Sequence, residues 1–128
     1  MLKDLQAHAT IPVSEVGRAR EWYEEKLGLT PSSETPGGLM YECGRGTRFV
    51  LYPSPEFAGK AGQTVAGFAA TDIEAEVTEL KARGVTFEDY DTESIKTVEG
   101  IATLGQLRAG WFRDQDGNIL GVVQFPQA

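Results

Sequence analysis

The order of predicted secondary-structure elements occurs twice along the 128-residue chain, and this duplication limits the fold more than any other feature. The first copy consists of a strand, a helix and three further strands, predicted at residues 7–13, 18–27, 30–38, 39–43 and 47–52. The second copy repeats that order at residues 64–70, 73–83, 85–90, 107–113 and 119–125. The duplication predicts an α+β fold built from two βαβββ modules.

The ends of the two predicted helices carry matching signals in the same frame. Ser14 and Asp72 are residue types that cap helix N-termini. Gly28 and Gly84 are typical of the position just beyond a helix C-terminus. Two helices with the same caps at nearly the same spacing strengthen the case for an internal duplication.

The boundary between the copies is predicted from composition. A polar, glycine-containing segment at 56–63 separates a first module at 1–55 from a second module at 64–128. We expect both modules to belong to one structural domain. Within the second module, the polar segment 91–105 is predicted to form a long loop.

Charge and cysteine content exclude several classes of function. The chain has 12 basic and 19 acidic residues, giving a net charge of −7, so neither nucleic acid nor a membrane surface is an expected partner. Cys43 is the single cysteine, which excludes an intrachain disulfide. The sequence has no signal-peptide stretch and no apolar run long enough to span a bilayer, so we expect a cytoplasmic protein.

Two segments resemble a known superfamily. The opening segment has His8 on the first strand, the aromatic pair Trp22-Tyr23 on the helix, and the stop Leu27-Gly28-Leu29. The closing segment 111–118 resembles the hairpin Trp-Phe-x-Asp-Pro-Asp-Gly-Asn, with Gln115 in place of the usual proline. This pattern is similar to the glyoxalase/bleomycin-resistance/extradiol-dioxygenase (vicinal oxygen chelate) superfamily. The resemblance implies curved mixed β-sheets around a cleft.

The resemblance also implies positions for metal ligands. Metal-dependent members place one ligand on each of four strands, and these positions match His8, Val50, Val65 and Gly121 in this chain. Only His8 has a donor atom in its side chain, and it is the single histidine of the chain. We therefore expect no bound metal and no cofactor.

Strand alternation predicts which residues line a metal-free cavity. If His8 faces the cavity, the same alternation brings a further set of side chains to it: Arg48, Tyr52, Glu42, Phe112 and Gly121. Such a mixture of apolar walls and few polar groups is typical of a small-molecule site. The alternative interpretation is that the small residues allow close sheet packing, while Glu42 and Arg48 form a solvated cross-strand pair.

Three functions remain open at this stage. The leading hypothesis is a metal-free protein that binds a small aromatic or amphipathic molecule. The second is an enzyme of the same superfamily, of the lyase, isomerase or dioxygenase type, that uses His8 as an acid or base. The third is the metal-dependent enzyme, with His8 as a metal ligand. The alternative interpretation of His8 is a purely structural residue on its strand.

The predicted assembly is a homodimer. Each module has a sheet but a single helix, so much of the sheet surface needs cover from another element. The resemblance implies that such cover comes from pairing modules within or between chains. The expected partners are therefore a small-molecule ligand and a second copy of the chain.

Overall fold

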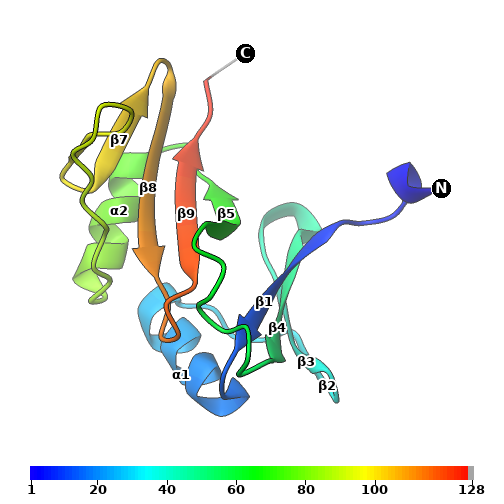
Figure 1. Cartoon of the computed structure of the whole chain (residues 1–128). Coiled ribbons are helices and arrows are strands. Elements are labelled where there is room, and N and C mark those ends of the chain that lie inside the picture. Colours follow the sequence, from blue (N-terminus) through cyan, green and yellow to red (C-terminus); the bar gives the residue numbers. More distant parts are fainter. Residues whose placement is uncertain (127–128) are drawn as a thin grey trace.

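The computed structural model describes residues 1–126 (Figure 1). Its first module contains one α-helix, two short 3-10 helices (Leu2–Asp4 and Gly44–Gly46) and four strands. The elements are β1 (His8–Val13), α1 (Val16–Leu27), β2 (Ser33–Thr35), β3 (Gly38–Glu42) and β4 (Arg48–Pro53). The sheet order is β1-β4-β3-β2. Strands β1 and β4 run parallel and the other pairs run antiparallel, so the sheet is mixed.

The second module repeats this arrangement with one additional short strand. Its elements are β5 (Thr64–Ala69), α2 (Ile73–Ala82), β6 (Thr97–Val98), β7 (Ile101–Leu104), β8 (Leu107–Arg113) and β9 (Ile119–Gln124). The sheet order is β5-β9-β8-β7-β6, with β5 and β9 parallel. Strands β5, β9, β8 and β7 thus correspond in order to β1, β4, β3 and β2. The predicted α+β fold of two βαβββ modules is confirmed.

One strand of the second module lies elsewhere than the sequence predicted. The segment 85–90 was predicted as a strand, but it makes a single bridge, between Phe87 and Phe112. The place of that strand in the sheet, next to β8, is taken instead by β7, which lies inside the predicted loop 91–105. Glu99 and Gly100 both have positive φ, and they reverse the chain between β6 and β7. A hairpin of this size needs few apolar residues. The polar composition of the segment therefore predicted a loop rather than two strands.

The helix caps follow the prediction at three of four ends. Asp72 caps α2, because its side chain accepts a hydrogen bond from the Ala75 amide at 3.2 Å. Gly28 at the end of α1 and Gly84 after α2 both have left-handed φ angles. The prediction for Ser14 is wrong: the N-cap of α1 is Glu15, and it makes no side-chain capping bond.

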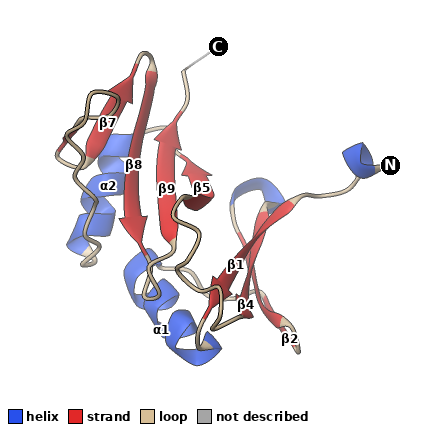
Figure 2. Ribbon diagram, in the orientation of Figure 1, coloured by secondary structure: helices blue, strands red, loops and turns tan. Residues whose placement is uncertain are grey.

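Helix α1 packs between the two sheets and joins their cores (Figure 2). Its Tyr23 contacts Tyr41 and Phe49 of the first sheet, with ring centroids about 6 Å apart. The neighbouring Trp22 stacks on Phe112 of the second sheet at 6.5 Å. Adjacent residues of one helix turn therefore serve the two modules. None of the helices in the described chain is long and apolar enough to cross a membrane.

The turn between β8 and β9 ties the second module to the first through hydrogen bonds. Asn118 donates to the Pro12 carbonyl at 2.8 Å and accepts from the Gly59 amide at 3.0 Å. Asp114 accepts from the Tyr23 hydroxyl at 2.8 Å. Asp114 and Asn118 are both buried, so these bonds are shielded from water. The turn thus fixes how the two modules are placed relative to each other.

Ser14 takes part in the same junction. Its amide and hydroxyl donate to the two carboxylate oxygens of Asp116, at 2.9 and 2.6 Å. Burial acts to raise the pKa of Asp116, but the bonds from Ser14 and Gln115 and the charge of Arg18 lower it below its usual value. The serine expected to cap a helix instead links the start of α1 to the β8–β9 turn.

Candidate functional site

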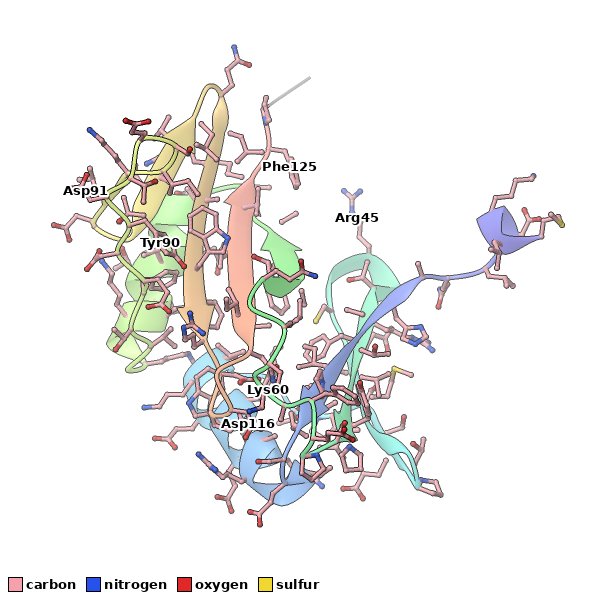
Figure 3. The ribbon with its side chains drawn as sticks, viewed as in Figure 1. Arg45, Lys60, Tyr90, Asp91, Asp116 and Phe125 are labelled. Carbon is pink, nitrogen blue, oxygen red and sulfur yellow. The ribbon has the colours of Figure 1, made fainter. Side chains whose placement is uncertain are left out.

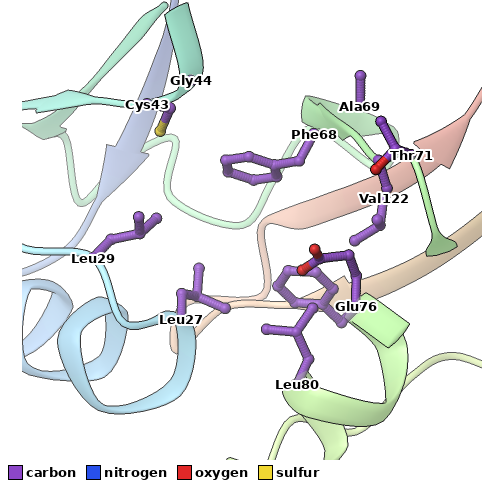
Figure 4. Close-up of a pocket in the computed structure, with 12 residues that line it drawn as sticks. Leu27, Leu29, Cys43, Gly44, Phe68, Ala69, Thr71, Glu76, Leu80 and Val122 are labelled. Atoms are coloured by element: carbon purple, nitrogen blue, oxygen red, sulfur yellow. The ribbon is translucent and has the colours of Figure 1, made fainter. Parts of the chain in front are cut away.

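An apolar hollow of about 410 Å³ lies between the two modules (Figure 4). Helix α1 and the chain after it contribute Leu27 and Leu29, and α2 contributes Leu80. Phe112 and Val122 form its floor on the second sheet. We call this hollow the chamber. Its size falls within the range of small-molecule sites, which begins near 300 Å³.

A second, more open hollow adjoins the chamber on the side of β1 and β4. It measures about 840 Å³ and is lined by the ends of those strands, by the turn 44–46 and by β5. We call it the vestibule. The two hollows share five lining residues: Cys43, Gly44, Phe68, Ala69 and Thr71. The chamber and the vestibule therefore form one continuous concavity.

Phe68 and Cys43 face each other where the two hollows meet. In Figure 4 the Phe68 ring points across the opening towards the Cys43 thiol. Phe68 also packs edge-on against Phe49, with ring centroids 6.0 Å apart, which steadies the ring. Burial raises the pKa of the Cys43 thiol, so the neutral thiol is favoured and the junction is uncharged.

The charged groups are unevenly distributed along this concavity. His8, Arg45 and Arg48 line the vestibule, and no acidic residue is among the residues that line it. Glu76 is the single charged residue that lines the chamber. His8 and Arg48 alternate with Ala9 and Phe49, whose side chains face the core, so their own side chains extend from the opposite face of the sheet at the edge of the vestibule.

Arg45 projects outward from the turn between β3 and β4 (Figure 3). Its φ of 57° and ψ of 31° lie in the left-handed region, which is uncommon for a residue other than glycine. Bonds within the turn hold this backbone: the Cys43 amide donates to the Thr47 carbonyl at 2.7 Å, and the Thr47 hydroxyl donates to the Gly44 carbonyl at 2.8 Å. Hydrogen bonds within the turn thus hold the backbone at Arg45.

The predicted site residues of the first module share one face of their sheet, and two of them, at the strand starts, border the vestibule. The pairing of Glu42 with Arg48 agrees with the predicted register, and His8 pairs with Arg48 from the other side. His8 and Arg48 begin their strands and line the vestibule. By strand alternation all four residues lie on the face of the sheet opposite α1, and Glu42 and Tyr52 line neither the chamber nor the vestibule.

The predicted register of the second module is wrong by one residue. Phe112 pairs with Leu120, so it shares the helix-facing side of the sheet with that residue. Gly121 pairs with Trp111 and lies on the opposite side. Phe112 therefore belongs to the floor of the chamber, whereas Gly121 lines neither hollow. The difference arises because β8 ends at Arg113, opposite Ile119, and leaves five residues in the turn.

Sequence reasoning missed Arg45, Phe68 and Leu80 as residues of the concavity. Phe68 pairs with Val122 and lies on the helix side of its sheet, whereas the predicted site was on the face that carries His8. A charged residue between two glycines of a short turn is a signal that could have identified Arg45. Leu80 depends on how the modules pack, for which the sequence carries no local signal.

The fold and the concavity together define a small α+β protein with two βαβββ modules and an apolar hollow between them. A sequence profile of the Glyoxalase/Bleomycin resistance protein/Dioxygenase superfamily matches residues 5–122. The chain belongs to this superfamily.

The relatives fit this assignment. The chain is 29% identical to the uncharacterized protein YurT of Bacillus subtilis (strain 168), over 90% of this chain and 94% of that protein. A glyoxalase/bleomycin resistance protein from Catenulispora acidiphila has a TM-score of 0.69 at 24% identity, covering 95% and 99% of the two chains. TnmS3, an antibiotic binding protein from Streptomyces sp. CB03234, has a TM-score of 0.64 at 22% identity, covering 96% of each chain. The likeness to the two solved structures shows the fold.

The residues at the four metal-ligand positions implied by the superfamily do not fit a divalent ion. His8 offers an imidazole nitrogen, but Val50, Val65 and Gly121 carry no donor atom. Within residues 1–126, no three His, Cys, Asp or Glu side chains lie close enough together to hold a metal ion. The site described above is instead built mainly from hydrocarbon side chains.

Proposed function

We propose that this protein binds a small aromatic or amphipathic molecule, without a metal ion, in the chamber between its modules. The observation that carries the proposal is the chamber itself: about 410 Å³ lined mainly by leucine, phenylalanine, valine and alanine side chains. An apolar concavity with few polar groups is the usual composition of a small-molecule site. The antibiotic-binding neighbour TnmS3, which has the same fold, supports a binding role by analogy.

Gly44 offers a way to block the concavity without disturbing the backbone. It lines both hollows, and a Cβ atom added there meets no heavy atom within 4 Å. Gly44→Trp therefore introduces an indole at the shared opening. Gly17 is a matched control, since it is exposed on α1, lines neither hollow, and has equally open space around an added Cβ.

The test is calorimetric titration with 2-naphthamide, an uncharged aromatic probe that fits the chamber. We expect binding to the wild-type protein and to Gly17→Trp, and about tenfold or greater weakening in Gly44→Trp. Thermal melting of the three proteins without probe establishes that each is folded. Equal affinity of the wild type and a folded Gly44→Trp would contradict binding in this concavity, as would the absence of binding to the wild type.

A further inference from the structure

We infer that the ligand of the chamber carries a positively charged group, such as a protonated amine, which binds beside Glu76 while its apolar body lies against the aromatic and leucine side chains. The inference rests on the proposed function and specifies the chemical class of the ligand. Its basis is the place of Glu76 among the described residues that line the chamber, of which it is the single charged one.

The Glu76 side chain is directed into the chamber. Glu76 and Leu80 are one helical turn apart on α2, so they share a face of that helix, and both line the chamber. Figure 4 shows the Glu76 carboxylate extending from α2 into the hollow, on the side of Phe68. A ligand in the chamber therefore comes within reach of this carboxylate.

The ion pairs of α2 leave this carboxylate available. The helix carries three glutamates, of which Glu74 pairs with Arg108 at 2.8 Å and Glu79 pairs with Arg83 at 3.8 Å. Glu76 has no basic side chain within 4.0 Å in the described part of the chain. The glutamate that faces the chamber is thus the one on α2 without an internal cation.

The remaining lining of the chamber favours a cation over an anion. None of the described residues that line it is basic, and its other polar side chains are the neutral Cys43 thiol and the Thr71 hydroxyl. An anionic group would therefore meet one carboxylate and be repelled by it. A cation is attracted by that carboxylate and by the faces of the Phe68 and Phe112 rings, which carry partial negative charge. The net charge of −7 also draws cations towards the protein.

The test compares two probes that share one ring system: 2-naphthylmethylamine, which is cationic at neutral pH, and uncharged 2-naphthamide. Their dissociation constants are measured by calorimetry for the wild type, Glu76→Gln and Glu21→Gln, at low and high salt. Glu21 is the matched control, because it is an exposed glutamate of α1 that lines neither hollow and forms no ion pair among the described residues. Glutamine keeps the size and the helix propensity of glutamate at both positions.

We expect the wild type and Glu21→Gln to bind the amine about fivefold more tightly than the amide; solvent screens the exposed Glu76 carboxylate and keeps the preference modest. Glu76→Gln should lose most of that preference, as should the wild type at high salt. The affinity of Glu76→Gln for naphthamide should change less than about twofold.

The outcomes separate this inference from the proposed function. If naphthamide binds and Gly44→Trp blocks it, but the wild type shows no preference for the amine, the inference is wrong and the proposed function stands. A preference that survives in Glu76→Gln, or that Glu21→Gln loses equally, would also overturn the inference, because the carboxylate at the chamber would not be its source. If neither probe binds the wild type, both proposals fall.

Discussion

Replacing Tyr23 or Tyr41 by phenylalanine removes one hydroxyl in each case, but the two losses should change stability in opposite directions. Tyr23 of α1 and Tyr41 of β3 are both completely buried, and their rings contact each other. The Tyr23 hydroxyl donates to the Asp114 carboxylate at 2.8 Å. The Tyr41 hydroxyl is buried without a hydrogen-bond partner among the described residues. The pair is thus a matched test of the module junction.

The expected magnitudes follow from these partners. A buried hydrogen bond to a charged group contributes about 1.5–3 kcal/mol, so Tyr23→Phe should lower the free energy of unfolding by about 2 kcal/mol. Asp114 keeps its bond from Asn118 at 2.9 Å, which limits the loss. Tyr41→Phe removes a buried group that forms no bond, so stability should rise by about 1 kcal/mol. The two variants should therefore differ by about 3 kcal/mol.

Urea denaturation followed by circular dichroism measures both effects on one scale. An unchanged slope of unfolding free energy against urea would establish that the variants unfold in the same manner as the wild type. In melting experiments, the changes should correspond to roughly 4 °C for each kcal/mol in a chain of this size. The reasoning would be refuted if Tyr23→Phe had the same free energy of unfolding as the wild type. It would also be refuted if Tyr41→Phe lowered that free energy by about 1 kcal/mol or more.

The same tyrosines predict how stability depends on pH. Burial, reinforced by Asp114, raises the pKa of Tyr23 well above its ordinary value, and burial raises the pKa of Tyr41 to about 12. The folded protein therefore holds these protons more tightly than the unfolded chain. Their contribution to stability is fully present below the unfolded pKa of 10.0 and is lost as pH rises towards about 12. Tyr41→Phe should lose less stability than the wild type over that interval.

Three further predictions concern the module junction, a tight strand contact and assembly. Ser14→Ala should lower the free energy of unfolding by about 1 kcal/mol at neutral pH, because the bond to Asp116 is lost. The difference from the wild type should vanish when acid protonates Asp116 below its lowered pKa, which urea titration at both pH values measures. Gly38→Ala should lower the free energy of unfolding by about 3 kcal/mol, because φ is +139° and the added Cβ would lie 2.1 Å from the Leu51 carbonyl oxygen. In the control Gly37→Ala, the added Cβ meets only Thr35 Oγ1 at 3.8 Å, so this variant should melt like the wild type. Equilibrium sedimentation at about tens of micromolar should give a homodimer, and a sole 13.9 kDa species would count against that assembly.

Most of the fold could be predicted because the duplication is carried by local signals. Asp72 and Gly28 mark helix ends through their own backbone chemistry, and the apolar alternation of the strands marks the buried faces. Ser14 shows the limit of such signals. Its hydroxyl lies near a helix start but donates to Asp116, a residue 102 positions away, instead of capping the helix.

The candidate site was harder to predict because it depends on how the modules pack. Alternation correctly grouped Glu42 with Arg48 on one face, but a face is a site only when something encloses it. The concavity lies on the helix side, where α1 and α2 approach each other, and its floor contains Phe112 because the β8–β9 turn is one residue off the assumed register. Neither the approach of two helices nor a turn register is encoded in a single strand.

The central claim is that an apolar ligand binds in the chamber between the modules, and residue-resolved NMR tests it most directly. Titration of 15N-labelled protein with 2-naphthamide should shift the amide resonances of Phe68, Thr71 and Leu80, which line the chamber. Gly44→Trp should suppress those shifts. Shifts confined instead to Glu42 and Tyr52, on the face of the first sheet opposite α1, would contradict the account and place the ligand on that open face.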